Sequence, residues 1–546
     1  MTKPPTVPIV ELPAAEAQAL LERVRLAMSP SDYEILAAVV QTVPILLDLL
    51  SQKNMSIARL RRMFLGFPSE KTADVLPDSS PDSSPDPAPA NPTDSPASDL
   101  KKEKRPGHGR NGTKDYPGAR HVPVAHPHLH AGDLCPACTV GKLYRLREPA
   151  RVLFIVAQPC FPATLFDLEQ LRCGACTKVF TAPIPPEAAQ GKYDASVSAL
   201  LAVLRYGAGV PMNRIAELQR NFGVPVPAGT QWGLLKETAQ GAAPVFQELQ
   251  RLAAQSPLIH IDDTYMRVLA LAKESPAAPD PEAPEADSER TGVFTTGVVA
   301  RTGEHDIALY FTGRQYAGEN VGDLFKQRSP ELPAPMLMCD ALPRNVPKEF
   351  AIILANCNCH GRRQFVDLVE NFPAECRQVL ESFRQIYHFD ALAKENGLSP
   401  QARLEFHQAQ SGPVMEQLHT WLQAQLDTHL VEPNSGLGKA FKYLLKHWDP
   451  LTLFLRQPGA PLDNNICEQM LKKAIRHRKN SLFYKTLMGA WVGDLFMSLI
   501  FTCQYAQTNA FDYLTALARN RQPVREHPDQ WLPWNYQTAL AGLNSS

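Results

Sequence analysis

The stretch PLDNNICEQMLKKAIRHRKNSLF, residues 461–483, decides the fold of the region around it. Its apolar residues recur at helical spacing, which predicts an amphipathic helix. Asp463 or Asn464 is expected to cap the start of this helix with a side-chain oxygen. Glu468 lies one turn into the predicted helix and has no acidic neighbour downstream. The residues that follow it carry positive charge only: Lys472, Lys473, Arg476, Arg478 and Lys479.

This pattern of one acid beside many bases has two interpretations. A carboxylate that holds a divalent metal, next to cations that hold phosphates, is what phosphoryl transfer on a nucleic acid requires. The alternative is an ordinary amphipathic helix with a solvated charged face. The stretch alone favours neither interpretation, so the deciding signal must come from other acids.

Two apolar segments upstream predict strands that end in carboxylates. Asp262 and Asp263 follow Leu258–Ile261, and the run Pro335–Cys339 stops at Asp340. Such strands suit a metal site, because the sheet core fixes the backbone while the acid faces the rim. Mg²⁺ prefers oxygen ligands, so three acids can hold a pair of ions. Acids at strand ends are also common turn residues, which is the alternative for each acid taken alone.

Seven motifs, in order along the chain, carry a resemblance to a known family. They are LRRMFLGFPSEK, the paired CxxC motifs, HIDDTYMRVL, CNCHGRRQF, PNSGLGKAFKYLLKHW, DNNICEQMLKKAIRHRKNSLF and QWLPWNY. In this combination the chain resembles the DDE transposases of the bacterial insertion sequence sixty-six family. It departs from the family pattern at Asp263, where Glu is usual after the first Asp, and at residues 341–343, Ala-Leu-Pro, where the family generally has Gly-Tyr.

The resemblance implies an RNase H-like catalytic domain in which Asp262, Asp340 and Glu468 bind two Mg²⁺ or Mn²⁺ ions. Such an enzyme cuts at the ends of a mobile element and joins the freed 3′ hydroxyls to target DNA. One ion would deprotonate the attacking oxygen while the other neutralises the leaving oxygen, so the three acids act mainly as ligands. The expected partners are the terminal inverted repeats and target duplex. Because two synapsed ends need at least two protomers, we expect a homodimer or higher oligomer on DNA, with accessory proteins of the same element as further partners.

Two other functions stay open at this stage. The chain could be a catalytically inactive DNA-binding relative or an accessory protein of a mobile element. It could also be an RNase H-like nuclease that hydrolyses DNA without joining it. The presence of all three acids in their motifs favours the enzyme over the inactive relative, and strand-transfer products would separate a transposase from a nuclease.

Basic residues near these motifs are candidates for DNA contact. Beside the predicted metal site we select Arg478, Lys479 and Asn480, with a second set at His360, Arg362 and Arg363. A short predicted helix near the N-terminus carries Arg59, Arg61 and Arg62, which could enter a DNA groove. A helical oligomerisation element is the alternative for that N-terminal helix.

The cysteines predict a structural zinc site. A cytoplasmic chain with 11 cysteines is not a disulfide framework. Cys135 and Cys138 form one CxxC turn, and Cys173 and Cys176 form another. Two such turns complete a closed Cys₄ site for one structural Zn²⁺. A redox pair or unrelated thiols are the alternatives.

Composition and breaks in the pattern predict an α/β multidomain protein. The formal net charge of −1 excludes a uniformly basic DNA coat, although residues 73–100 carry six Asp and no Lys or Arg. No 18-residue apolar run or signal peptide is evident, so we expect a soluble cytoplasmic protein without membrane contact.

The predicted parts are a helical DNA-binding or oligomerisation region (1–71), a disordered acidic then basic linker (72–118), a zinc-finger module (119–185), a helical connecting region (186–256), the first part of the catalytic domain (257–359, with a disordered loop at 273–290), an all-helical insertion (360–456), the second part of the catalytic domain with the Glu-bearing helix (457–520) and a C-terminal tail (521–546).

Overall fold

The structure is a computed structural model that describes residues 23–24, 33, 127–138, 140–144, 146, 160–172, 179–186, 191–273 and 292–545. The chain divides into two compact units, one formed by Met1–Ser83 with Leu354–Asp463 and the other by Ser84–Ile353 with Asn464–Ser546. We call their described parts the helical unit and the sheet unit. Apart from residues 23, 24 and 33, the predicted N-terminal region and linker (1–118) lie outside the described residues.

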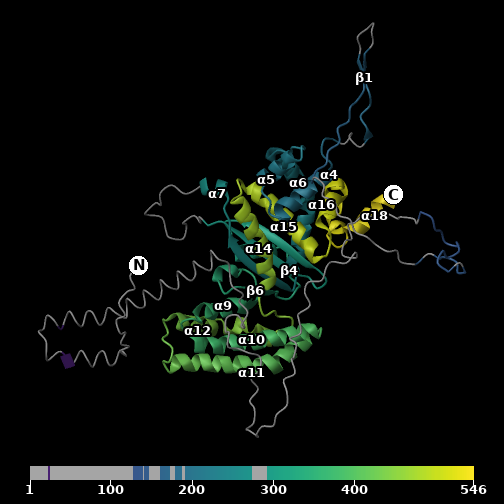
Figure 1. The fold of residues 1–546 in the computed structure, drawn as a ribbon. Helices are drawn as coiled ribbons and strands as arrows, with labels where there is room; N and C mark the ends of the chain where they lie inside the picture. The colour runs from purple at the N-terminus through teal and green to yellow at the C-terminus, as the bar shows by residue number, and fades with distance from the viewer. Residues whose placement is uncertain are drawn as a thin grey trace, which may run out of the picture. The chain divides into compact units, whose positions relative to one another are not determined.

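A five-stranded sheet forms the core of the sheet unit (Figure 1). Its strand order is β5-β4-β3-β6-β7. The strands are β3 (Leu258–Tyr265), β4 (Phe294–Arg301), β5 (Asp306–Gly313), β6 (Met336–Cys339) and β7 (Ile353–Asn356), with the boundary between the units inside β7. The pairs β3–β4 and β4–β5 are antiparallel, whereas β3 and β6 are parallel. The two parallel strands are buried where they pair, as the continuous apolar runs predict.

Helices surround this sheet. The elements of the sheet unit besides the sheet are β1 (Gln170–Arg172), β2 (Val179–Thr181), α4 (Ala195–Ala202), the π-helix η3 (Val203–Gly207), α5 (Met212–Asn221), α6 (Ala228–Ala254), α7 (Leu269–Lys273), α8 (Ala317–Phe325), η5 (Pro343–Asn345), α14 (Asn465–Ser481), α15 (Leu487–Tyr505), α16 (Ala510–Arg519), α17 (Arg521–Glu526), η7 (Pro528–Trp531) and α18 (Tyr536–Ser545). α14 and α8 lie on opposite faces. Gly297 of β4 abuts α14, whereas the neighbouring Thr296 accepts a hydrogen bond from Asn320 of α8 at 2.9 Å. Because successive residues of a strand point to opposite faces of the sheet, α14 and α8 pack on different faces.

Helix α15 covers the edge strand β5. Three of its side chains, spaced one turn apart, accept hydrogen bonds from alternate backbone N–H groups of β5, which would otherwise be an open sheet edge. The pairs are Asp494–Thr312 at 2.7 Å, Ser498–Tyr310 at 2.9 Å and Thr502–Ala308 at 3.1 Å. Among the described helices, α15 alone is long and apolar enough to cross a membrane by composition, but 72% of its apolar window is buried. It is therefore a core helix of the sheet unit.

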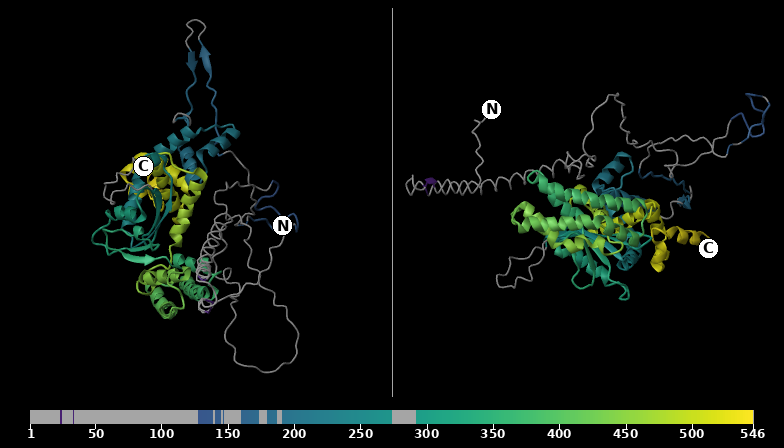
Figure 2. Two further views of the ribbon diagram at one scale, coloured as in Figure 1. Left: turned by 90° about the vertical axis from the view of Figure 1, so that its left-hand side faces the viewer. Right: turned by 90° about the horizontal axis from the view of Figure 1, so that it is seen from below.

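The helical unit consists of helices after β7. These are α9 (Asn358–Leu368), α10 (Pro373–Glu395), α11 (Pro400–Asp427), α12 (Gly436–Lys446), α13 (Trp448–Leu451) and η6 (Leu453–Leu455). Every described element from 360 to 456 is thus helical, as the sequence predicts, and α10 and α11 run side by side (Figures 1 and 2). The Ser-Pro signal at the start of α11 is confirmed, because the Ser399 side chain accepts from the N–H of Ala402 at 3.3 Å.

A buried ion network joins α10 to α11. Asp390, only 4% exposed, accepts from Arg403 at 2.6 Å, from Lys394 at 2.6 Å and from His407 at 3.3 Å. Burial by itself would raise the pKa of Asp390, but the hydrogen bonds from His407 and Lys394 and the charge of Arg403 hold it well below its usual range. Arg403 also donates to the carbonyl of Ala460 at 2.9 Å. The network therefore ties the segment after η6 to the two long helices.

Candidate active site and nucleic-acid interface

The parallel register of β3 and β6 brings two carboxylates together. Ile259 pairs with Leu337 and His260 pairs with Met338. Continuing this register by two residues aligns Asp262 with Asp340, the residue that follows β6. Neighbouring strands lie about 4.8 Å apart, so the two carboxyl groups meet at the same end of the strand pair.

Asp262 and Asp263 point to opposite faces of the sheet. Asp262 pairs with Gly297 across the β3–β4 ladder, and residues directly opposite in a ladder share a face. Asp262 therefore faces α14, the helix that carries Glu468. Asp263 is turned to the other face, so only the first acid of the pair shares a face of the sheet with α14.

The side chain of Asn464 fastens the start of α14 to β3. Its amide nitrogen donates to the carbonyl of Ile261 at 2.8 Å, so its oxygen accepts from Nδ1 of His260 at 3.1 Å. Burial lowers the pKa of His260 to about 4, which keeps the ring neutral. For Asn464 the predicted side-chain cap is therefore wrong: Asn464 occupies the N-cap position, but its side chain makes no capping hydrogen bond, because the amide is committed to β3.

A glycine lets α14 approach the sheet beside Asp262. A Cβ atom at Gly297 would lie 2.7 Å from Cε of Met470 and 3.0 Å from Cγ of Leu471. The hydroxyl of Tyr310 donates to the carbonyl of Met470 at 2.8 Å, which holds the helix at this distance. Glu468 lies about one turn before Leu471 on the same helix, and its charge acts on Asp262.

The charges of Asp340 and Glu468 both act on Asp262. Burial, together with the charges of Asp340 and Glu468, raises the pKa of Asp262 to about 7, although the N–H of Asp263, which donates to Asp262 at 2.8 Å, lowers it. Like charges gathered in a buried place destabilise one another. A divalent cation with a preference for oxygen ligands relieves that repulsion, so the donor set fits Mg²⁺ or Mn²⁺.

The loop after β6 holds Asp340 and Asp263 by hydrogen bonds that the sequence did not indicate. The Asn345 side chain and the N–H of Leu342, at 3.2 Å, both donate to Oδ1 of Asp340. Arg344 donates to Asp263 at 3.0 Å. Burial raises the pKa of Asp263, and the guanidinium charge opposes this. Arg344 is separated from Asp263 by a long stretch of sequence, so no local pattern could have identified the pair.

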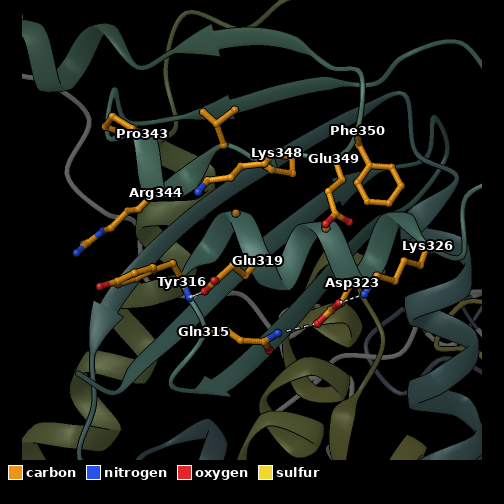
Figure 3. A pocket seen from close by; sticks show the side chains of 14 residues that line it. Gln315, Tyr316, Glu319, Asp323, Lys326, Pro343, Arg344, Lys348, Glu349 and Phe350 are labelled. Atoms are coloured by element: carbon orange, nitrogen blue, oxygen red, sulfur yellow. Dashed lines mark hydrogen bonds and ion pairs between the residues drawn. The ribbon is translucent and has the colours of Figure 1, made fainter. Parts of the chain in front are cut away.

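Arg344 also lies at the end of a groove of about 540 Å³ on the α8 side of the sheet (Figure 3). Its guanidinium carbon is 5.1 Å from the ring centre of Phe294 and 5.2 Å from that of Tyr316. The groove runs between α8 and residues 343–350, with Phe350 and Lys326 at its other end (Figure 3). The two rings fix the guanidinium on the face of the sheet away from α14, where it neutralises Asp263.

The basic residues of α14 separate into two groups. Arg478 donates to Oγ1 of Thr264 at 3.2 Å and to the carbonyl of Tyr265, and Asn480 donates to the carbonyl of Gly209 at 3.0 Å. These two predicted DNA contacts therefore have structural partners. Lys479 is exposed, and it shares one face of α14 with Glu468 and two exposed bases that we had not selected, Lys472 and Arg476. These four residues fall within an arc of about 80° at 3.6 residues per turn.

The other predicted DNA contacts are placed differently. His360, Arg362 and Arg363 lie on α9 of the helical unit, where Arg362 is 9% exposed and the other two are half-buried. Arg59, Arg61 and Arg62 lie outside the described residues. DNA contact at all six positions stays a prediction.

The described half of the zinc motif is a turn in a small hairpin. Leu134 bridges to Lys142, and the N–H of Cys135 donates to the carbonyl of Gly141 at 2.7 Å. Backbone N–H groups of Gly141 and Val140 lower the pKa of Cys138, which favours the thiolate that a metal requires. Cys173 and Cys176 lie outside the described residues, although β1 and β2, which flank them, pair as a hairpin. The four-cysteine site stays a prediction.

Comparison with known proteins identifies the family of this chain. A family model described as "Transposase IS66 family" matches residues 190–491. Two relatives come from Sinorhizobium fredii (strain NBRC 101917 / NGR234). "Uncharacterized protein y4jD" is 26% identical over 431 residues, 74% of this chain and 79% of the relative, and "Uncharacterized protein y4hP" is 23% identical over 427 residues, 74% of each. The family match covers most of the sheet unit with Asp262, Asp340 and Glu468, as well as residues 354–463 of the helical unit, and the chain belongs to the IS66 family of transposases.

Proposed function

We propose that the protein is a DDE transposase that cleaves DNA at the ends of its mobile element and joins the free 3′ ends to target DNA. The observation that carries this proposal is the convergence of three carboxylates from β3, from the loop after β6 and from α14. The raised pKa of Asp262, caused first by burial and then by the charges of Asp340 and Glu468, supports this arrangement. Sheet order and the parallel acid-bearing strands support an RNase H-like fold for this part of the chain.

Asp262, Asp340 and Glu468 would hold the divalent ions of this reaction. Two bound Mg²⁺ or Mn²⁺ ions supply Lewis acid chemistry at the attacking and leaving oxygens of an in-line displacement. The side chains contribute geometry rather than proton transfer. Asn464 fixes the start of the Glu-bearing helix, and Arg344 keeps the neighbouring Asp263 away from the site.

The exposed bases of α14 serve as phosphate contacts in this proposal. Lys472, Arg476 and Lys479 follow Glu468 along one helix face and form no ion pair among the described residues. A duplex whose backbone lies along this face would place phosphates close to the carboxylates. Phosphate contacts position the duplex without reading its sequence, so end recognition must come from other elements.

Further parts of the proposal extend beyond the sheet unit. We assign one structural Zn²⁺ to Cys135, Cys138, Cys173 and Cys176, and DNA-end recognition to that module and the N-terminal region. The partners are terminal inverted repeats and target DNA, bound by a homodimer or higher oligomer in the cytoplasm. Accessory proteins of the same element complete the machinery.

A DNA-binding relative without activity is the competing function. The three acids and the groups that hold them are all present, which favours the enzyme. The test is Glu468→Gln, which keeps the shape of the side chain but removes the charge. We expect cleavage and joining to fall by about 10³-fold or more, in line with the loss of a group on which catalysis depends, while binding to element ends persists.

Both outcomes of that test are decisive. Cleavage by the Gln variant at the wild-type rate would remove Glu468 from the site. A wild-type protein that binds element ends without cleaving them in Mg²⁺ or Mn²⁺ would favour the inactive relative. Cleavage without strand-transfer products would identify a nuclease.

A further inference from the structure

Helix α12 of the helical unit carries a basic face that the catalytic proposal does not use. Its sequence, GLGKAFKYLLK, contains no acid. Lys439, Lys442 and Lys446 are all exposed. At 3.6 residues per turn they fall within an arc of about 60° and extend for about 10 Å along the helix axis. The three lysines therefore form one narrow positive stripe.

The opposite face of α12 is committed to packing, so the direction of the stripe is fixed within the unit. Leu437, Ala440, Phe441 and Leu444 are buried. A Cβ at Gly361 of α9 would lie 2.9 Å from Leu444, and the Phe441 ring lies 5.4 Å from that of Trp421 on α11. Packing against two helices leaves α12 no freedom to turn its lysines inward.

The stripe differs from two exposed bases on α10, which have acidic partners. On α10, Arg384 pairs with Glu381 at 2.5 Å and Lys394 pairs with Asp390 at 2.6 Å. Within the described part of the chain, none of the three α12 lysines forms an ion pair. Ordinary solvated helix faces mix both signs. A single-sign stripe attracts an extended anion.

We propose that Lys439, Lys442 and Lys446 contact the phosphate backbone of duplex DNA, as a second DNA surface separate from the bases of α14. Each strand of B-DNA carries one phosphate charge per ~3.4 Å of axis, so a stripe about 10 Å long lies against roughly three phosphates of one strand. The partner rests on the proposed function, in which the protein acts on DNA. The chain's own acidic tract, residues 73–100, is the competing occupant.

The experiment measures how binding to a duplex of unrelated sequence depends on salt. Each lost phosphate contact lowers the slope of log affinity against log salt by about 0.9, so Lys439→Gln, Lys442→Gln and Lys446→Gln together should lower it by about 2.7. Gln retains helix propensity, and a melting curve like that of the wild type shows that the fold is kept. A matched control removes three paired bases, Arg251, Arg301 and Arg384, and its slope should equal that of the wild type.

Cleavage separates this inference from the proposed function. At saturating DNA, the α12 variant should cleave element ends at the wild-type single-turnover rate, whereas Glu468→Gln should lose cleavage and keep the salt slope. An unchanged slope in the α12 variant would overturn the inference and leave the active site intact. The inference would also be overturned if the lysine substitutions changed the salt slope only in a protein whose six Asp of residues 73–100 are replaced by Asn. In that case the lysines of the unchanged protein bind the acidic tract and not DNA.

Discussion

Gly297→Ala tests whether the distance between α14 and the sheet sets the activity. Gly297 is the cross-strand partner of Asp262, and its missing side chain is what lets Met470 and Leu471 pack against β4. The substitution adds one methyl group and changes no charge. The three atoms nearest to the new methyl group belong to Met470 and Leu471 and to no proposed metal ligand, so we expect a loss of activity to act through the position of α14.

The magnitude follows from the two contacts. The new Cβ would meet Cε of Met470 at 2.7 Å and Cγ of Leu471 at 3.0 Å. Carbon atoms pack at about 3.5–4.0 Å, so the helix must retreat by roughly 0.5–1 Å near Leu471. Overpacking of this kind costs about 1–3 kcal/mol of unfolding free energy. A displacement of about 1 Å in a catalytic group can lower the rate by about 100-fold.

We therefore expect Gly297→Ala to cleave element ends about 10- to 100-fold more slowly than the wild type, with DNA affinity unchanged. Single-turnover cleavage and a filter or gel binding assay measure the two effects. Met470→Leu removes the closest atom, Cε, and should restore part of the rate when combined with Gly297→Ala. Gly313→Ala is the matched control, because no heavy atom lies within 4 Å of its Cβ position. Wild-type cleavage by a folded Gly297→Ala protein would refute the reasoning.

Three further predictions concern metal, stability and zinc. The pKa of Asp262 is raised to about 7, so ionisation of this side chain costs the metal-free fold up to roughly 4 kcal/mol of unfolding free energy as the pH rises from about 4 through 7. Mg²⁺ or Mn²⁺ should therefore raise the melting temperature more above pH 7 than below it. An equal rise in melting temperature on both sides of pH 7 would count against the metal site. Asp390→Asn leaves Arg403 without its buried partner and should cost about 3 kcal/mol in denaturant unfolding. The Asp390 pKa is depressed, so its contribution is present above pH of about 4 and fades below it, a dependence that the Asn variant should lack. Cys173→Ser should lose one equivalent of zinc, measured by metal analysis, while the catalytic domain stays folded. Wild-type protein that contains less than half an equivalent of zinc would contradict the zinc site.

Local patterns in the sequence predicted the parts of the site. Apolar runs that end in acids indicated β3 and β6, and helical spacing after Pro461 indicated α14 with Glu468 in its first turn. The strand and helix predictions succeeded because periodicity is a property of short segments, but Asp262 and Asp263 lie inside β3, which continues to Tyr265, and not at its end as predicted. The Ser399 cap of α11 is likewise a property of a short segment.

Only the tertiary structure decided which side chains meet. Strand alternation put Asp262 toward α14 and Asp263 away from it, and the β3–β6 register aligned the first with Asp340. The same long-range packing diverted Asn464 from its helix cap to β3 and bound Arg478 to the end of that strand. Hydrogen bonds between residues far apart in the chain depend on how the elements pack, and no window of the sequence contains that information. The three lysines of α12 can be read from the sequence. Their exposure and their lack of acidic partners among the described residues follow from the packing of α9 and α11 against the other face of the helix.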